Sequence, residues 1–172
     1  MKKKLAAVIV TVLVIAVLAF GFFALRQGIA RRKMPDSVTL FAASAKGVSY
    51  NIRDILENPD DFSEPGLSGV SVYFDQLIKY APQLETLCAD EAEFEYFLFM
   101  LQSRYNEFCA VYDSFSSIGA LSEEDIAFLS ELKTSLDTLR AAMVKENGKA
   151  DIRVLKDSYF TKAISAFSGN EY

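Results

Sequence analysis

The feature that most constrains this chain is an uninterrupted apolar run near its N-terminus, Leu5–Leu25. The run contains 21 residues without a charge; residues 2–4 before it are all lysine, and Arg26 follows it. A helix of that length rises about 30 Å, which matches the hydrocarbon thickness of a bilayer. In lipid, a helix is the single-segment structure that satisfies every backbone polar group internally. The run therefore predicts a transmembrane helix.

A cleaved signal peptide is the alternative to a retained anchor. The apolar region of a signal peptide is usually about 7–15 residues long, and small residues mark the cut. The run here is longer, and its one passable cut, after Ala30, lies well beyond its end. We therefore expect an uncleaved anchor.

Basic residues, which resist translocation, lie on both sides of the predicted span. The short tail with its three lysines favours an N-terminus in the cytoplasm and an extracytoplasmic position for the rest of the chain. The second basic group is expected to contact anionic lipid headgroups at the membrane surface. It consists of Arg26, Arg31, Arg32 and Lys33. The predicted localisation is thus the cell membrane, with a single pass through the lipid bilayer.

The remainder of the chain is strongly acidic. The whole chain has a formal net charge of −5. The first 33 residues carry seven basic side chains and no acidic one, which leaves −12 for residues 34–172. Such a charge repels phosphate backbones, so nucleic acid is not an expected partner.

Five segments after the basic linker carry apolar residues at three- and four-residue steps, as helices with one buried face do. They cover about 37–57, 68–88 with a break near Tyr80 because of Pro82, 90–117, 122–147 and 151–167, and a loop is expected over 59–66. No segment alternates with a period of two, so no strand is predicted. The predicted fold is all-α: a single N-terminal transmembrane helix followed by an antiparallel bundle of four to five helices. The predicted divisions are a tail 1–4, an anchor 5–25, a juxtamembrane linker 26–36, a bundle 37–168 and a C-terminal tail 169–172.

Several chemistries are disfavoured by residue content. The chain has no histidine, so Ser-His-Asp, Cys-His and Glu-x-x-His arrangements cannot form. Cys88 and Cys109 fall at core-facing positions, which favours buried thiols over a disulfide. The acidic clusters Asp60–Asp61, Glu91–Glu95 and Glu123–Asp125 resemble helix-start acids more than a calcium loop. We predict no catalytic residue, no metal, no cofactor and a non-enzymatic role.

One group of side chains on the aromatic segment 90–117 has two interpretations. It comprises Phe97, Leu101, Tyr105 and Phe108. A Phe/Tyr stripe at helical spacing is usually core. The alternative is a pocket between helices for an apolar ligand.

A second group on the same segment falls outside its apolar face. It comprises Tyr96, Phe99 and Met100, on the side that also carries Ser103, Glu107 and Ser114. The favoured expectation is that a further helix of the bundle covers these three side chains, and the alternative is contact with a partner protein.

These observations predict a non-enzymatic interaction or scaffold component of a membrane complex, with a protein partner of unknown identity. The alternative function is an extracytoplasmic binding module for a small apolar or peptide ligand. A stable partner that co-purifies in mild detergent would favour the first function, and a dry cavity lined by Phe97, Leu101, Tyr105 and Phe108 would favour the second.

Overall fold

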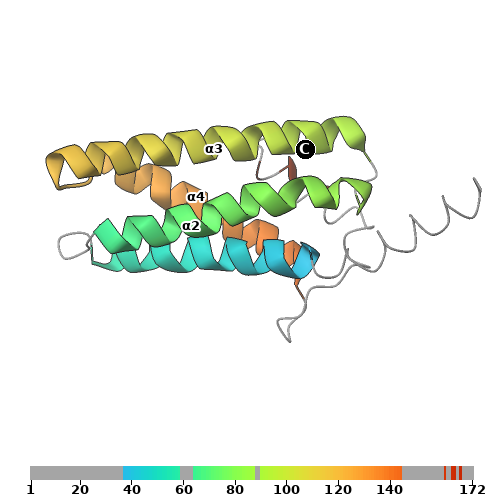
Figure 1. Cartoon of the computed structure of the whole chain (residues 1–172), viewed down its shortest axis with the longest axis horizontal. Helices are drawn as coiled ribbons and strands as arrows, with labels where there is room; N and C mark the ends of the chain where they lie inside the picture. The colour runs from blue at the N-terminus through green and yellow to red at the C-terminus, as the bar shows by residue number, and fades with distance from the viewer. Residues whose placement is uncertain are drawn as a thin grey trace, which may run out of the picture. The chain divides into compact units, whose positions relative to one another are not determined.

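The computed structural model describes residues 37–58, 64–87, 90–144, 161, 164, 165 and 167 (Figure 1). Within these ranges the chain forms a helix over residues 37–57, α2 (Glu64–Tyr80), the 3₁₀ helix η1 (Ala81–Leu87), α3 (Glu91–Ile118) and α4 (Glu123–Met143), and it forms no β-strand. All of these elements belong to one compact unit, Asp36–Tyr172. The all-α class and the helical bundle predicted from the sequence are thus confirmed for the described residues.

The second helix begins earlier than the sequence predicts. A loop over 59–66 and a helix from about Ser68 were expected, whereas α2 begins at Glu64. Pro65 is compatible with this start, because a proline in the first helical turn lacks only an N–H that has no intrahelical partner. The segment 59–66, whose composition predicts a loop, therefore contains the start of α2.

The predicted break at Pro82 is confirmed. The α-helical part ends at Tyr80, and the chain continues as η1. Proline has no N–H to donate and its ring clashes with the carbonyl four residues earlier, so an α-helix does not continue through it. Ala81 and Leu84 are nevertheless buried, so η1 extends the apolar face of α2.

Local caps define where α3 and α4 begin. The Asp90 carboxylate accepts a hydrogen bond from the backbone N–H of Glu93 at 3.1 Å. Ser122 and Asp125 form a reciprocal capping box, in which each backbone N–H donates to the other side chain. Between the two helices, Gly119 ends α3 with φ 76°, a left-handed conformation that glycine adopts without steric cost. The short turn makes α3 and α4 an antiparallel pair.

Helix 37–57 and the α2–η1 segment run antiparallel in one constant register (Figure 1). From one contacting pair to the next, the residue number rises along helix 37–57 by as much as it falls along the α2–η1 segment. The pairs are Ser37 with Gln83, Ser44 with Gln76, Gly47 with Tyr73, and Asn51 with Gly69. On helix 37–57, small and short polar residues occupy these positions. Both glycines meet a side chain of the other helix, so the two backbones approach closely at these points.

The apolar seams of the described helices meet in one core. The predicted seam of helix 37–57 is buried throughout, at Val38, Phe41, Ala45, Val48, Ile52 and Ile55. Aromatic rings connect the helices, with centroids 6.4 Å apart for Phe41 and Phe97 and 6.1 Å apart for Phe74 and Phe108. Burying a side chain of this size stabilises a fold by about 1.5–3 kcal/mol. These rings therefore dominate how helix 37–57 and α2 pack on α3.

Three predicted segments fall wholly or mainly outside the described residues. The anchor Leu5–Leu25 and the basic linker 26–36 lie there, as does most of the expected last helix. None of the helices that the structure does describe is long and apolar enough to cross a membrane. Of the expected last helix, Ile164, Ser165 and Phe167 are helical and buried.

Candidate functional site

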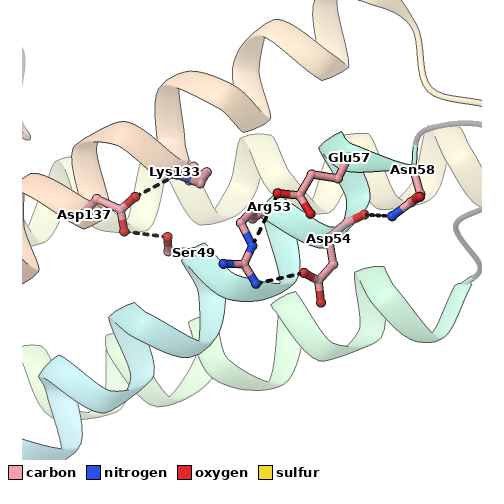
Figure 2. Close-up of polar contacts among 7 residues, drawn as sticks. All are labelled: Ser49, Arg53, Asp54, Glu57, Asn58, Lys133 and Asp137. Carbon is pink, nitrogen blue, oxygen red and sulfur yellow. Dashed lines mark hydrogen bonds and ion pairs between the residues drawn. The ribbon is translucent and has the colours of Figure 1, made fainter.

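A polar cluster joins helix 37–57 to α4 (Figure 2). The Ser49 hydroxyl donates to Asp137 Oδ1 at 2.6 Å, and Lys133 Nζ donates to Asp137 Oδ2 at 2.8 Å. Ser49 is 7% exposed, whereas the Lys133 and Asp137 side chains are 29% and 43% exposed. Arg53 does not join this cluster; it pairs with two acidic residues of its own helix.

The electrostatics of this cluster indicate a structural role. Burial acts to raise the pKa of Asp137, but hydrogen bonds from Lys133 and Ser49 outweigh burial and leave the pKa below its ordinary value. A carboxylate with a lowered pKa is a weak base, so it does not activate the Ser49 hydroxyl as a nucleophile. The Lys133 ammonium is directed at the carboxylate. The cluster therefore connects two helices and is not arranged for nucleophilic chemistry.

Two further polar contacts fix α3 between its neighbours. The Tyr105 hydroxyl donates to Asp75 Oδ1 on α2 at 2.6 Å. This hydrogen bond, with a smaller contribution from burial, raises the pKa of Tyr105 to about 12. On the side of α4, Arg104 forms ion pairs with Glu131 and, within α3, with Glu107. The hydroxyl and the guanidinium are thus engaged by protein carboxylates.

The first turn of α3 contacts the described part of the C-terminal segment. The Ser165 hydroxyl contacts the Glu93 carboxyl group and lies 2.9 Å from the Thr161 carbonyl oxygen. Desolvation, and less strongly the Asp90 carboxylate, raises the pKa of Glu93. Glu93 lies three residues after the N-cap Asp90, a spacing at which a capping box can form, but its side chain lies against Ser165. Glu93 therefore serves the packing of two segments.

The residues of the hypothetical pocket lie in the packed core between helices. Phe97, Leu101 and Phe108 are buried, and Tyr105 is half-buried. Their ring contacts are Phe97 with Phe41, Phe94 and Phe167, and Phe74 with both Tyr105 and Phe108. Centroid separations of 5.3–6.4 Å are typical of aromatic pairs in direct contact. These contacts favour the core interpretation of the aromatic stripe.

Tyr96 and Phe99 lie on the outside of α3 and stack on each other. Their ring centroids are 6.4 Å apart with an interplanar angle of 24°. Tyr96 is 40% exposed and Phe99 is 66% exposed, while Met100 is half-buried. The favoured expectation of a covering helix is therefore wrong for the two rings. The helix packs through its other face, where the buried residues are Phe94, Phe97, Leu101, Phe108 and Val111.

Among the other predicted residues that the structure describes, no further site is assembled. Within the described ranges, no three acidic or thiol side chains are grouped so that they could hold a metal ion. Cys109 is a free, half-buried thiol. Cys88 lies outside the described residues, as do all four members of the predicted membrane-surface group, Arg26, Arg31, Arg32 and Lys33. The exposed aromatic pair is thus the candidate functional feature in the described part of the chain.

The Ser49–Asp137–Lys133 cluster is not predicted from the sequence. Lys133 and Asp137 are four residues apart on one helix, a spacing at which opposite charges pair. That signal is readable from the sequence, but it does not identify Ser49 as the third member. The pairing follows from the packing of helix 37–57 on α4.

Comparison of the chain with protein-family models, with curated proteins and with solved structures finds no match. No family is therefore assigned. The exposed aromatic pair and the charges around it are the observations that bear on function.

Proposed function

We infer that this chain is a single-pass membrane protein whose helical bundle serves as a non-enzymatic interaction component of a membrane complex. The apolar run Leu5–Leu25 supports the anchor, and the exposed, stacked pair of Tyr96 and Phe99 on α3 is the observation that carries the interaction role. Single exposed apolar side chains are common, but adjoining large rings form a patch of the kind used for protein contacts. Aromatic residues are enriched at the centres of such contacts.

The alternative function, a binding module for a small apolar or peptide ligand, has weaker support. It requires space among Phe97, Leu101, Tyr105 and Phe108. The rings of three of these residues contact other core rings, and the Tyr105 hydroxyl is bonded to Asp75. An outer surface is therefore the better candidate for recognition.

The interaction function is tested by purifying the affinity-tagged full chain from its native membrane in nonionic detergent. We compare the wild-type protein with Phe99→Ser and with Ile118→Ser. Ile118 is a matched control because it is 74% exposed at the far end of the same helix. A protein that co-purifies in a fixed ratio with the wild type and with Ile118→Ser, and that is lost with Phe99→Ser, supports the function.

The stability of the variants must be measured alongside. Phe99→Ser is expected to change the free energy of unfolding by less than about 0.5 kcal/mol, as surface substitutions usually do. Loss of the partner then reflects loss of the contact. Absence of any protein in a fixed ratio, or its retention by Phe99→Ser, would contradict an interaction through this pair.

The anchoring and orientation are tested separately by cysteine labelling. Ala120 lies in the exposed turn between α3 and α4, and Ala120→Cys is introduced after Cys88→Ser and Cys109→Ser. The lysines at positions 2–4 favour an extracytoplasmic bundle, so a membrane-impermeant thiol reagent should label intact cells. Labelling only after lysis would place the bundle in the cytoplasm. Recovery of the chain without detergent would contradict the anchor.

A further inference from the structure

The surroundings of the exposed aromatic pair indicate which chemistry its partner carries. Glu95 precedes Phe99 by one helical turn, and Glu91 precedes Glu95 by another; both carboxylates are exposed. From Glu91 through Ser103, α3 carries three glutamates and no basic residue. We call Tyr96, Phe99, Glu91 and Glu95 the acidic aromatic face.

Among the described residues, cations of this protein lie over the rings of Tyr50, Tyr80 and Phe128. The Arg53 guanidinium lies 4.5 Å from the centroid of Tyr50, and Arg104 lies 5.9 Å from that of Phe128. Within the described residues, the rings of Tyr96 and Phe99 contact each other and lie against no other ring or cation. The nearest basic residue along α3, Arg104, is engaged by Glu107 and Glu131. The acidic aromatic face therefore has no described cation of its own.

This combination selects among possible occupants by charge. Aromatic faces attract ammonium and guanidinium groups, and neighbouring carboxylates strengthen that attraction. Residues 34–172 carry a formal net charge of −12, which disfavours approach to anionic lipid headgroups or nucleic acid. A basic protein segment gains from both the rings and the carboxylates.

We propose that the acidic aromatic face binds a basic amphipathic segment of a partner protein, with apolar side chains against Tyr96 and Phe99 and lysine or arginine side chains at Glu91 and Glu95. The proposal rests on the interaction function above and adds the chemical class of the partner. The cations bring charges that α3 itself lacks over this stretch, and the apolar side chains remove the two rings from water.

A tryptophan introduced at the face reports occupancy directly, because the chain contains no tryptophan. We use the full chain in nonionic detergent with Phe99→Trp, and Ile118→Trp as the control at the other end of α3. The probes are two tryptophan-free amphipathic peptides of the same pattern, one of leucine and lysine and one of leucine and glutamate. A saturable blue shift of Phe99→Trp emission is expected with the lysine peptide alone.

Salt and charge reversal give the second readout. Raising the salt from about 0.05 M to about 0.5 M, which screens exposed charges, should weaken binding of the lysine peptide by about fivefold or more. Glu91→Lys with Glu95→Lys should weaken it by a similar factor. The control Ile118→Trp should not respond.

Three results would overturn the proposal: an equal shift with the glutamate peptide, an equal response at position 118, or no shift with the lysine peptide. These results leave the interaction function standing if a native protein still depends on Phe99 for co-purification. Loss of that dependence, by contrast, contradicts the interaction function itself.

Discussion

Gly47 and Tyr73 lie so close across helix 37–57 and α2 that a Cβ atom at position 47 would be 2.5 Å from Cγ and Cδ1 of the Tyr73 ring. Real Cβ atoms do not make contacts this short, so any side chain at position 47 must displace the ring. The glycine weakens the helix intrinsically, by about 1 kcal/mol relative to alanine. Its benefit is the close approach of two helices.

Gly47→Ala is therefore expected to destabilise the protein by about 1–2 kcal/mol, because the cost of displacing Tyr73 exceeds the gain in helix propensity. In a Tyr73→Ala background the ring is gone, and the same substitution should stabilise by up to about 1 kcal/mol. Chemical denaturation followed by circular dichroism measures all four proteins. A coupling energy near zero in this double-mutant cycle would show that the ring moves aside freely.

The hydrogen bonds that Asp137 accepts from Lys133 and from Ser49 make stability depend on pH in a defined direction. The folded pKa of Asp137 is lowered, so its stabilising effect is complete above the ordinary pKa of about 4 and is lost as the pH falls through the folded value. Asp137→Asn should cost about 1 kcal/mol or less at neutral pH, because the side chain is 43% exposed. The difference from wild type should vanish in acid.

The matched control for this prediction is Asp113→Asn, at an exposed position late in α3. Denaturation curves at neutral and acidic pH should show little effect of Asp113→Asn at either value. A loss of stability in Asp137→Asn that is the same at both pH values would contradict the role of its ionised form.

The apolar seams were predictable because helical periodicity alone determines which residues share a face. Phe41 and Ile52 are eleven residues apart, close to three helical turns, and both are fully buried. Pro82 was equally informative, since its missing N–H acts within a few residues. These features depend on local chain geometry.

The lateral contacts were not predictable from the same patterns. Ser49 gives no sign in the sequence of pairing with a residue 88 positions away. The exposure of Phe99 likewise depends on where neighbouring helices lie, and periodicity says only that it is out of pattern. Both features are set by tertiary packing, which adds information that no single helix contains.

Tyr105 should titrate abnormally because its hydroxyl donates a hydrogen bond to the Asp75 carboxylate. Its pKa is raised to about 12, so its stabilising effect is complete below the ordinary value of about 10 and is lost as the pH rises through the folded value. Asp75→Asn removes the negative acceptor and should bring ionisation to lower pH. Phenolate absorbance of both proteins, each compared with its Tyr105→Phe derivative, isolates this one tyrosine. Superimposable titrations of Tyr105 in the two backgrounds would rule out the hydrogen bond as the cause.

Glu93 should behave in the opposite sense to Asp137. Desolvation beside the C-terminal segment, with the Asp90 carboxylate nearby, raises its pKa. Its contribution to stability is therefore greatest below the ordinary value of about 4 and decreases as the pH rises through the folded value. At neutral pH the ionised carboxylate is less favourable than a neutral group of the same shape.

Glu93→Gln should consequently match or exceed wild-type stability at neutral pH, by up to about 1 kcal/mol, because the amide is uncharged and can still bond the Ser165 hydroxyl. The gain should disappear in acid, where Glu93 is itself protonated, and it should shrink when Ser165→Ala removes the hydroxyl. Glu95→Gln, at an exposed neighbouring position, is the control and should show little effect. Denaturation at both pH values measures these differences. Marked destabilisation by Glu93→Gln at neutral pH would mean that the Ser165 contact requires the charge, and the desolvation account would then be wrong.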